Sequence, residues 1–102
     1  MLVWEEKLNL GKGKYIVMDA KITDTQHLML VQNYVHRENP LYVEYCEKDA
    51  QDKRFNLTST TIEEAKKEAE EVIMKYLFNE AHTWLKRYNR FKEAVFNETT
   101  SN

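Results

Sequence analysis

Glycine, proline and cysteine are scarce in this chain of 102 residues, which has two glycines, one proline and one cysteine. The lone cysteine, Cys46, cannot form a disulfide within the chain, so a disulfide-stabilised secreted fold is not expected. Gly11 and Gly13 are too few for a glycine-rich phosphate-binding loop, and they precede a predicted strand instead of a helix. After Pro40 the chain has no residue that would break a helix on steric grounds.

Long apolar runs and an excess of one charge are also absent. No apolar run approaches the roughly 20 residues needed to cross a membrane. The acidic Glu5 and Glu6, directly after the first four residues, do not fit a signal peptide. Together with the single cysteine, these features predict a cytoplasmic location. The formal net charge is only −2, so binding to nucleic acid would need a local basic patch.

The first part of the chain shows the alternation of apolar and polar residues that is typical of strands with one buried face. We predict a single domain, residues 1–102, whose residues 2–58 form an antiparallel β-meander of four or five strands. Polar or glycine-containing turns at residues 11–13, 23–26 and 37–40 separate the strands. The predicted strands are residues 2–10, 15–22, 27–36, 41–47 and, as a short fifth, 54–57.

Residues 61–97 contain neither glycine nor proline, and their apolar residues recur every three or four positions, as in an amphipathic helix. Two overlapping capping boxes, Thr60 with Glu63 and Thr61 with Glu64, mark its start. Such a helix would be roughly 55 Å long, whereas strands in a small sheet span about 20 Å. Residues 98–102 are polar and are predicted to fray. The predicted fold is therefore α+β, with a long C-terminal helix that extends beyond its sheet.

Apolar residues occupy more than one side of this helix. The main stripe consists of Ile62, Ala65, Ala69, Ile73, Leu77, Ala81, Trp84, Tyr88, Phe91 and Val95. A second apolar set, off this stripe, consists of Val72, Met74, Phe78, Leu85 and Phe96. A helix that is apolar on more than one side usually has more than one neighbour.

Self-association would provide that neighbour. We predict a homodimer whose contacts come from Ile73, Leu77, Phe78, Ala81, Leu85 and Val95. An antiparallel arrangement is favoured because the helix has an acidic start and a basic end. The alternative is a break near residues 79–82, which would give an αα-hairpin that buries the apolar residues within one chain.

Catalytic and metal-binding signatures are not apparent. Cys46 with His27 or His36 would be the obvious nucleophile and base. If residues 37–40 form the turn of a hairpin, Cys46 pairs with Val31 and lies roughly 17 Å from either histidine. The histidines and Cys46 show none of the spacings of metal sites. We therefore predict no metal site, no cofactor and no enzymatic activity.

The strongest candidate site is a segment near the end of the helix in which cations and aromatic residues alternate. The predicted partner-binding residues are Trp84, Lys86, Arg87, Tyr88, Arg90, Phe91 and Lys92. Arginine and aromatic residues are typical of protein-binding hot spots. The same segment could instead neutralise phosphates and stack on bases, with help from Lys12 and Lys14. A purely structural role also fits, because cations near a helix C-terminus complement its dipole.

Trp4, the segment Gly13-Lys14-Tyr15-Ile16 and the helix start Ser59-Thr60-Thr61-Ile62-Glu63-Glu64-Ala65-Lys66 together suggest a family. Over residues 4–75 the chain resembles short meander-plus-helix proteins carried by bacteriophages and other mobile elements. It is also similar in outline to the arm-binding domains of phage-type integrases, although it has more strands and a longer helix, and their DNA-reading positions do not map onto it. The resemblance implies a small protein that blocks a host or defence factor, or one that binds DNA.

Taken together, these features predict a non-catalytic intracellular binding protein, a small adaptor or inhibitor that acts as a homodimer. Its partner would be another protein, which would contact either the exposed face of the sheet or the basic aromatic end of the helix. The alternative function is a nucleic-acid-binding module that uses the same end of the helix. A membrane association is not expected.

Overall fold

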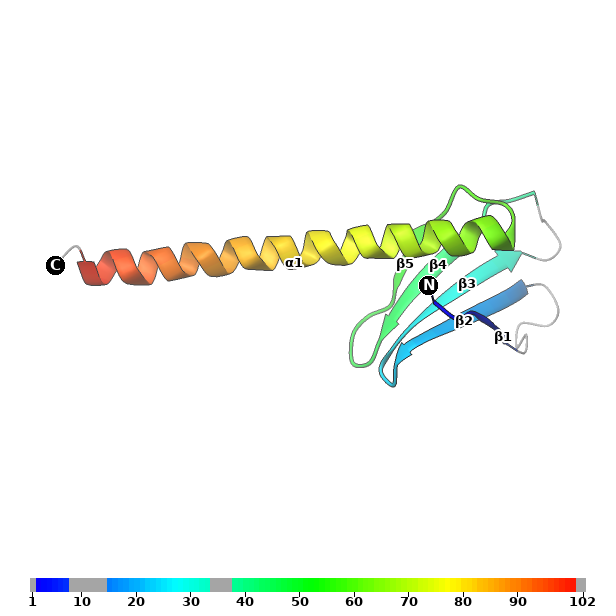
Figure 1. The fold of residues 1–102 in the computed structure, drawn as a ribbon, viewed down its shortest axis with the longest axis horizontal. Coiled ribbons are helices and arrows are strands. Elements are labelled where there is room, and N and C mark those ends of the chain that lie inside the picture. Colours follow the sequence, from blue (N-terminus) through cyan, green and yellow to red (C-terminus); the bar gives the residue numbers. More distant parts are fainter. Residues whose placement is uncertain (1, 8–14, 34–37, 101–102) are drawn as a thin grey trace.

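The computed structural model describes residues 2–7, 15–33 and 38–100, which form a five-stranded antiparallel sheet followed by one long helix (Figure 1). The elements are β1 (Glu5–Lys7), β2 (Tyr15–Thr23), β3 (Gln26–Asn33), β4 (Tyr42–Glu47), β5 (Lys53–Asn56) and α1 (Ile62–Thr100). The strands lie in the sheet in chain order, and each is antiparallel to its neighbours. The predicted α+β fold is confirmed, with five strands in the meander.

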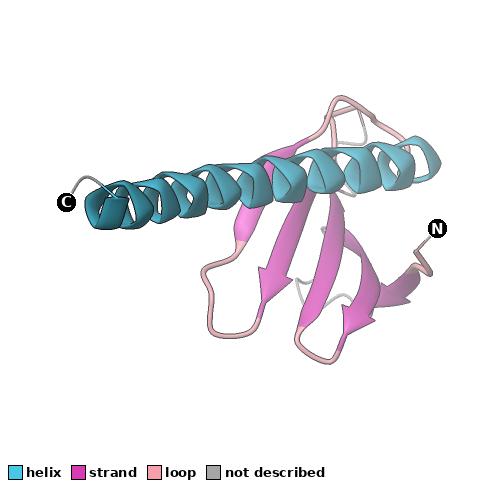
Figure 2. Cartoon of the chain, turned by 60° about the vertical axis from the view of Figure 1, so that its left-hand side comes forward, coloured by secondary structure: helices cyan, strands magenta, loops and turns pink. Residues whose placement is uncertain are grey.

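One face of the sheet is covered by the first turns of α1, which pack against the central strands β3 and β4 (Figure 2). The alternation in β3 directs Leu28 and Leu30 toward the helix, where each is only 1% exposed. On the helix, Ala65 and Ala69 are fully buried, and their small side chains allow the helix to lie close to the strands. Ile73 is the last buried residue of α1. The core therefore uses only about the first third of the helix.

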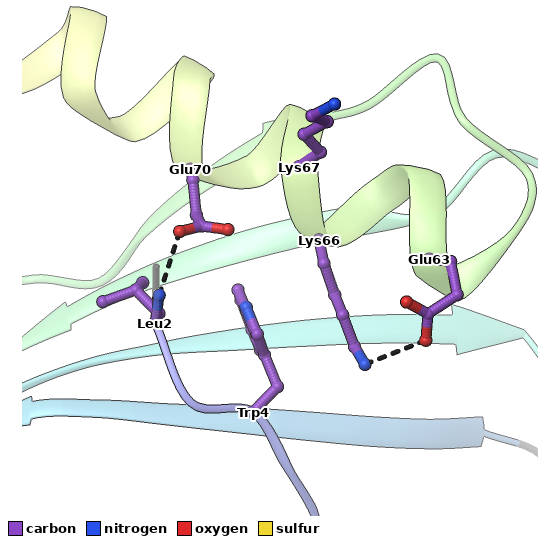
Figure 3. Close-up of a pocket in the computed structure, with 6 residues that line it drawn as sticks. All are labelled: Leu2, Trp4, Glu63, Lys66, Lys67 and Glu70. Carbon is purple, nitrogen blue, oxygen red and sulfur yellow. Dashed lines mark hydrogen bonds and ion pairs between the residues drawn. The ribbon is translucent and has the colours of Figure 1, made fainter.

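The N-terminal segment packs beneath these same turns (Figure 3). Among the described residues of the predicted first strand, 2–7, the pairing with β2 involves Glu5–Lys7. Leu2 and Trp4 pack against the core, and the backbone N–H of Leu2 donates to Oε1 of Glu70 at 3.1 Å. Residues 8–10 of that predicted strand and the turn at residues 11–13 lie outside the described residues, as do Lys12 and Lys14.

The pairing of β3 with β4 differs from the prediction. His27 lies opposite Cys46, and Val31 lies opposite Tyr42, so the predicted pair of Cys46 with Val31 is wrong. In the described part of the chain, β3 extends to Asn33 and β4 begins at Tyr42. Residues 34–37, which include the rest of the predicted third strand, lie outside the described residues. The pairing is shifted by four positions, an even number, so the same residues share a face of the sheet in both registers.

The helix start is fixed by two sets of hydrogen bonds. Thr61 Oγ1 accepts from the backbone N–H of Glu64 at 3.4 Å, which is the contact expected of the second predicted capping box. One turn further on, the carboxylate of Glu68 accepts four donors at 2.6–3.0 Å: the backbone N–H and the hydroxyl of both Thr58 and Ser59. Desolvation raises the pKa of Glu68, but these hydrogen bonds outweigh it and lower the pKa from 4.5 to about 2. Glu68 thereby fastens the preceding loop to the helix.

The ring of Tyr76 still packs against Tyr45 and Phe55 of the sheet, and beyond it α1 continues past the sheet as a single helix (Figure 1). Its 39 residues give a length of about 58 Å, and the molecule measures 68 × 26 × 23 Å. The alternative αα-hairpin, with a break at residues 79–82, is therefore wrong. The helix also includes residues 98–100, which were predicted to fray. Within the described ranges, no helix has both the length and the apolar character that a membrane crossing requires.

Candidate functional site

Residues 74–100 of α1, here called the projecting segment, expose many large apolar side chains. Their exposed fractions range from 37% for Leu77 to 71% for Phe91. The exposed set consists of Met74, Leu77, Phe78, Trp84, Leu85, Tyr88, Phe91, Val95 and Phe96. Single exposed apolar residues are common, whereas nine large ones on one helical segment make this segment the candidate interaction surface.

Five of the predicted partner-binding residues of the projecting segment fall on two faces of the helix, and the other two, Arg87 and Lys92, lie at the two edges of the aromatic face. At 100° per residue, Trp84, Tyr88 and Phe91 fall within an arc of about 60°. Lys86 and Arg90 lie roughly 130–170° away from the centre of that arc. The alternation of cations and aromatic residues along the sequence is therefore not an alternation on one surface. One face is aromatic, and a different face is basic.

Arg87 lies between these two faces, and its guanidinium contacts the Trp84 ring of the aromatic face. Its guanidinium carbon Cζ is 4.9 Å from the centroid of the Trp84 ring, a cation–π contact across three residues. One turn earlier, the rings of Phe78 and His82 stack with centroids 6.1 Å apart. These contacts order the exposed rings along the helix and leave much of their surface open to solvent.

The predicted dimerisation residues are also placed differently from one another. Ile73 is 4% exposed and belongs to the chain's own core. Leu77 lies at the boundary, whereas Phe78, Ala81, Leu85 and Val95 are exposed. The core thus takes one of the six predicted residues, and the projecting segment presents the other five.

An apolar groove lies where α1 leaves the sheet. It has a volume of about 350 Å³. Its walls come from the N-terminal segment, the sheet and the helix: Leu2, Ile22, Leu28, Glu70, Ile73, Met74 and Leu77. Sequence analysis missed this groove, because no local pattern shows that these three segments meet.

The open face of the sheet, the other predicted binding surface, is more polar. Lys7 Nζ lies 3.7 Å from a carboxylate oxygen of Asp19. Arg54 Nη2 lies 3.3 Å from Glu44 Oε1, and the Arg54 guanidinium stacks 4.0 Å from the centroid of the Tyr42 ring. The charged groups on this face are largely engaged with one another. The projecting segment is therefore the better candidate for an apolar interface.

On this same face the structure brings together two residues that sequence analysis had separated. Cys46 lies opposite His27, whose Nδ1 is 2.7 Å from Oδ1 of Asp19. A carboxylate, an imidazole and a thiol in this order are typical of cysteine nucleophiles. However, burial raises the pKa of the Cys46 thiol to about 11, and the negative charges of Asp52 and Glu44 act in the same direction. The thiol is therefore protonated near neutral pH, the opposite of what a nucleophile requires.

Glu44, Cys46 and Asp52 also form the one group in the described part of the chain whose possible metal-ligand atoms lie within 4.8 Å of one another. Glu44 is already paired with Arg54, and the Cys46 thiol is hydrogen-bonded to Asp52. No metal-site spacing in the sequence indicates this group, because the three residues meet only through the pairing of β4 with β5 and the loop between them.

Comparison with protein-family models, curated proteins and solved structures finds no significant match to the chain.

Proposed function

We propose that this chain is a non-catalytic binding protein, a small adaptor or inhibitor, that acts through protein–protein contacts and as a homodimer. The observation that carries this proposal is the exposed apolar face of the projecting segment. Trp84 is 63% exposed and Phe91 is 71% exposed, and aromatic side chains of this kind supply most of the energy at the centre of protein interfaces. Burying them against a partner removes apolar surface from water.

A protein partner is favoured over a nucleic acid by the division of the helix into two faces. Base stacking combined with phosphate contacts requires aromatic and cationic side chains on the same surface. Here Lys86 and Arg90 point away from the aromatic face, and Arg87 is engaged with the Trp84 ring. The net charge of −2 adds no general attraction to phosphates. Nucleic-acid binding is the alternative, and nuclease treatment distinguishes it from binding to a protein.

The absence of catalysis is supported by the protonation of Cys46, the side chain best placed to act as a nucleophile. A cytoplasmic location is supported by the use of this lone cysteine as a buried, unpaired thiol. The resemblance to phage proteins that block host or defence factors suggests the inhibitor role in particular.

The proposal is tested by affinity capture from a host lysate with three immobilised proteins. The wild-type chain is compared with Trp84→Lys/Phe91→Lys, which places charges on the aromatic face. The matched control is Thr83→Lys/Asn89→Lys, which adds the same charges to the same turns but off that face. We expect a protein that the wild type and the control both retain and the aromatic variant loses.

Retention of the same proteins by all three chains would contradict the role of the aromatic face. Each capture is repeated after nuclease treatment and at raised salt. If nuclease abolishes binding, the nucleic-acid alternative is correct, and the affinity should then fall by about 0.9 log unit per log unit of salt for each phosphate contacted.

A further inference from the structure

We propose that a second copy of this chain occupies the apolar face of the projecting segment, in one defined antiparallel register. In this register the two-fold axis passes between His82 and Thr83, so that Ala81 lies against Trp84 of the partner subunit. The inference rests on the proposed homodimer and adds its direction, its register and the occupant of the groove.

The spacing of the apolar residues changes where the helix leaves the sheet. Within the core, Ala65, Ala69 and Ile73 recur every four residues. From there on, one row of apolar residues, here called the seam, alternates between intervals of three and four: Met74, Leu77, Ala81, Trp84, Tyr88, Phe91 and Val95. Phe78, Leu85 and Phe96 lie beside this row. Alternation of three and four is the heptad repeat by which two helices pack side by side. The apolar spacing of the projecting segment therefore favours packing against another helix, whereas the spacing in the first turns favours packing against the sheet.

Charged residues flank the seam, and their signs distinguish a parallel from an antiparallel pair. In a parallel pair, Arg87 would lie beside the partner's Lys92, which is a repulsive contact. In the antiparallel register proposed here, Glu80 lies beside the partner's Arg87, and Glu71 lies beside the partner's Lys92. Each of these contacts occurs twice because of the two-fold symmetry. The charges therefore favour the antiparallel direction.

The register is selected by packing as well as by charge. A slide of one heptad toward the C-terminus would place Arg87 against the partner's Arg87. In the proposed register the smallest residue of the seam, Ala81, faces the largest, the partner's Trp84. The partner's Phe91 then lies beside Met74 and Leu77, at the mouth of the groove that Leu2 and Ile22 also line. The groove thus receives an aromatic side chain of the second copy.

The contact is large enough for a stable dimer. At their exposed fractions, Phe78, Trp84, Tyr88 and Phe91 each offer on the order of 100 Å². With the aliphatic side chains of the seam, each chain buries roughly 600 Å², so that the pair buries about 1,200 Å², the lower bound for specific interfaces.

The test is the dimer dissociation constant of charge-reversed variants, measured by analytical ultracentrifugation. Glu80→Arg and Arg87→Glu each create two like-charged contacts in the proposed register. We expect each single variant to raise the dissociation constant by roughly fivefold. The double variant Glu80→Arg/Arg87→Glu restores opposite charges and should return it to within about twofold of the wild type. Lys86→Glu, the matched control on the outer face, should have no effect.

The possible failures are distinguishable. Tighter association of Arg87→Glu would indicate the parallel pair, because the introduced carboxylate would then meet the partner's Lys92. Failure of the double variant to restore association would overturn the register while leaving the homodimer intact. A mass of 12.3 kDa at every concentration would overturn the homodimer itself. Another protein would reach the same aromatic face only by displacing the second copy, so a captured protein that binds the intact dimer must use a different surface.

Discussion

Glu68 offers the sharpest test of how the helix is attached to the sheet. Its carboxylate accepts hydrogen bonds from the backbone N–H and hydroxyl groups of both Thr58 and Ser59, at 2.6–3.0 Å. The substitution Glu68→Gln keeps the shape of the side chain, removes its charge and replaces one acceptor oxygen with a donor. The new NH₂ group then faces a donor, so at least one of these hydrogen bonds is lost.

The stabilisation by Glu68 depends on pH in a direction that follows from its pKa. The folded value of about 2 lies below the ordinary value of 4.5. Above about pH 4.5 the carboxylate is ionised in both states, and its full contribution is present. As the pH falls from about 4.5 to about 2, the unfolded chain takes up the proton first, and the contribution is lost. The pKa difference alone corresponds to about 3 kcal/mol, but the bonds to Thr58 are exposed to solvent, so we expect about 1–2 kcal/mol.

The measurement is urea-induced unfolding, followed by circular dichroism, at several pH values between 7 and 2.5. We expect the free energy of unfolding of Glu68→Gln to lie about 1–2 kcal/mol below that of the wild type at pH 7, and the gap to close as the pH approaches 2.5. Glu93→Gln, which removes the same charge from an exposed position of the projecting segment, is the control and should show no such gap. A difference between wild type and Glu68→Gln that stays constant over this pH range would refute the reasoning.

Two further predictions concern buried residues. Because burial raises the pKa of Cys46 to about 11, its alkylation by iodoacetamide at pH 8 should be about 100-fold slower than that of a free thiol; rapid, complete labelling of the folded protein would show that the thiol is neither buried nor protonated. Ala69 is fully buried against the sheet, so Ala69→Leu should lower the free energy of unfolding by about 1–3 kcal/mol. Ala94→Leu, at an exposed position of the same helix, is the matched control in thermal unfolding, and equal effects of the two substitutions would contradict the close packing.

The sequence alone was sufficient to group the residues that share a face of strand 41–47, because alternation with a period of two places every second residue on the same face. Val43 and Tyr45, two residues apart in the predicted strand 41–47, both lie in the core. The long helix was predictable for a similar reason, since residues 61–97 contain no glycine or proline that would interrupt it.

The strand register was not predictable from the same pattern. A shift by two or four residues leaves the alternation unchanged, so the sequence could not distinguish Val31 from His27 as the residue opposite Cys46. The apolar groove was hidden for a different reason. It forms from Leu2, Ile22 and Met74, which lie on three separate segments, and each residue taken singly looks like an ordinary apolar position.

The division of the basic aromatic segment into two faces, in contrast, was contained in the sequence. Trp84, Tyr88 and Phe91 follow helical spacing, and Lys86 and Arg90 fall outside it. Along the sequence, cations and aromatic residues alternate, and this alternation hides their separation. At 100° per residue the two kinds of side chain fall on different faces of the helix.

The attachment of the loop at Thr58 and Ser59 to Glu68 has a mechanical consequence. The free end of α1 lies about 40 Å beyond Ile73, and the helix is continuous over that distance. A tilt of about 5° at its attached end would therefore displace the far tip by about 3.5 Å, close to the thickness of an aromatic ring. A small change in the angle between the helix and the sheet would therefore be enlarged into a displacement of the far end of the helix. Such a displacement would alter how the exposed face of the helix meets a partner.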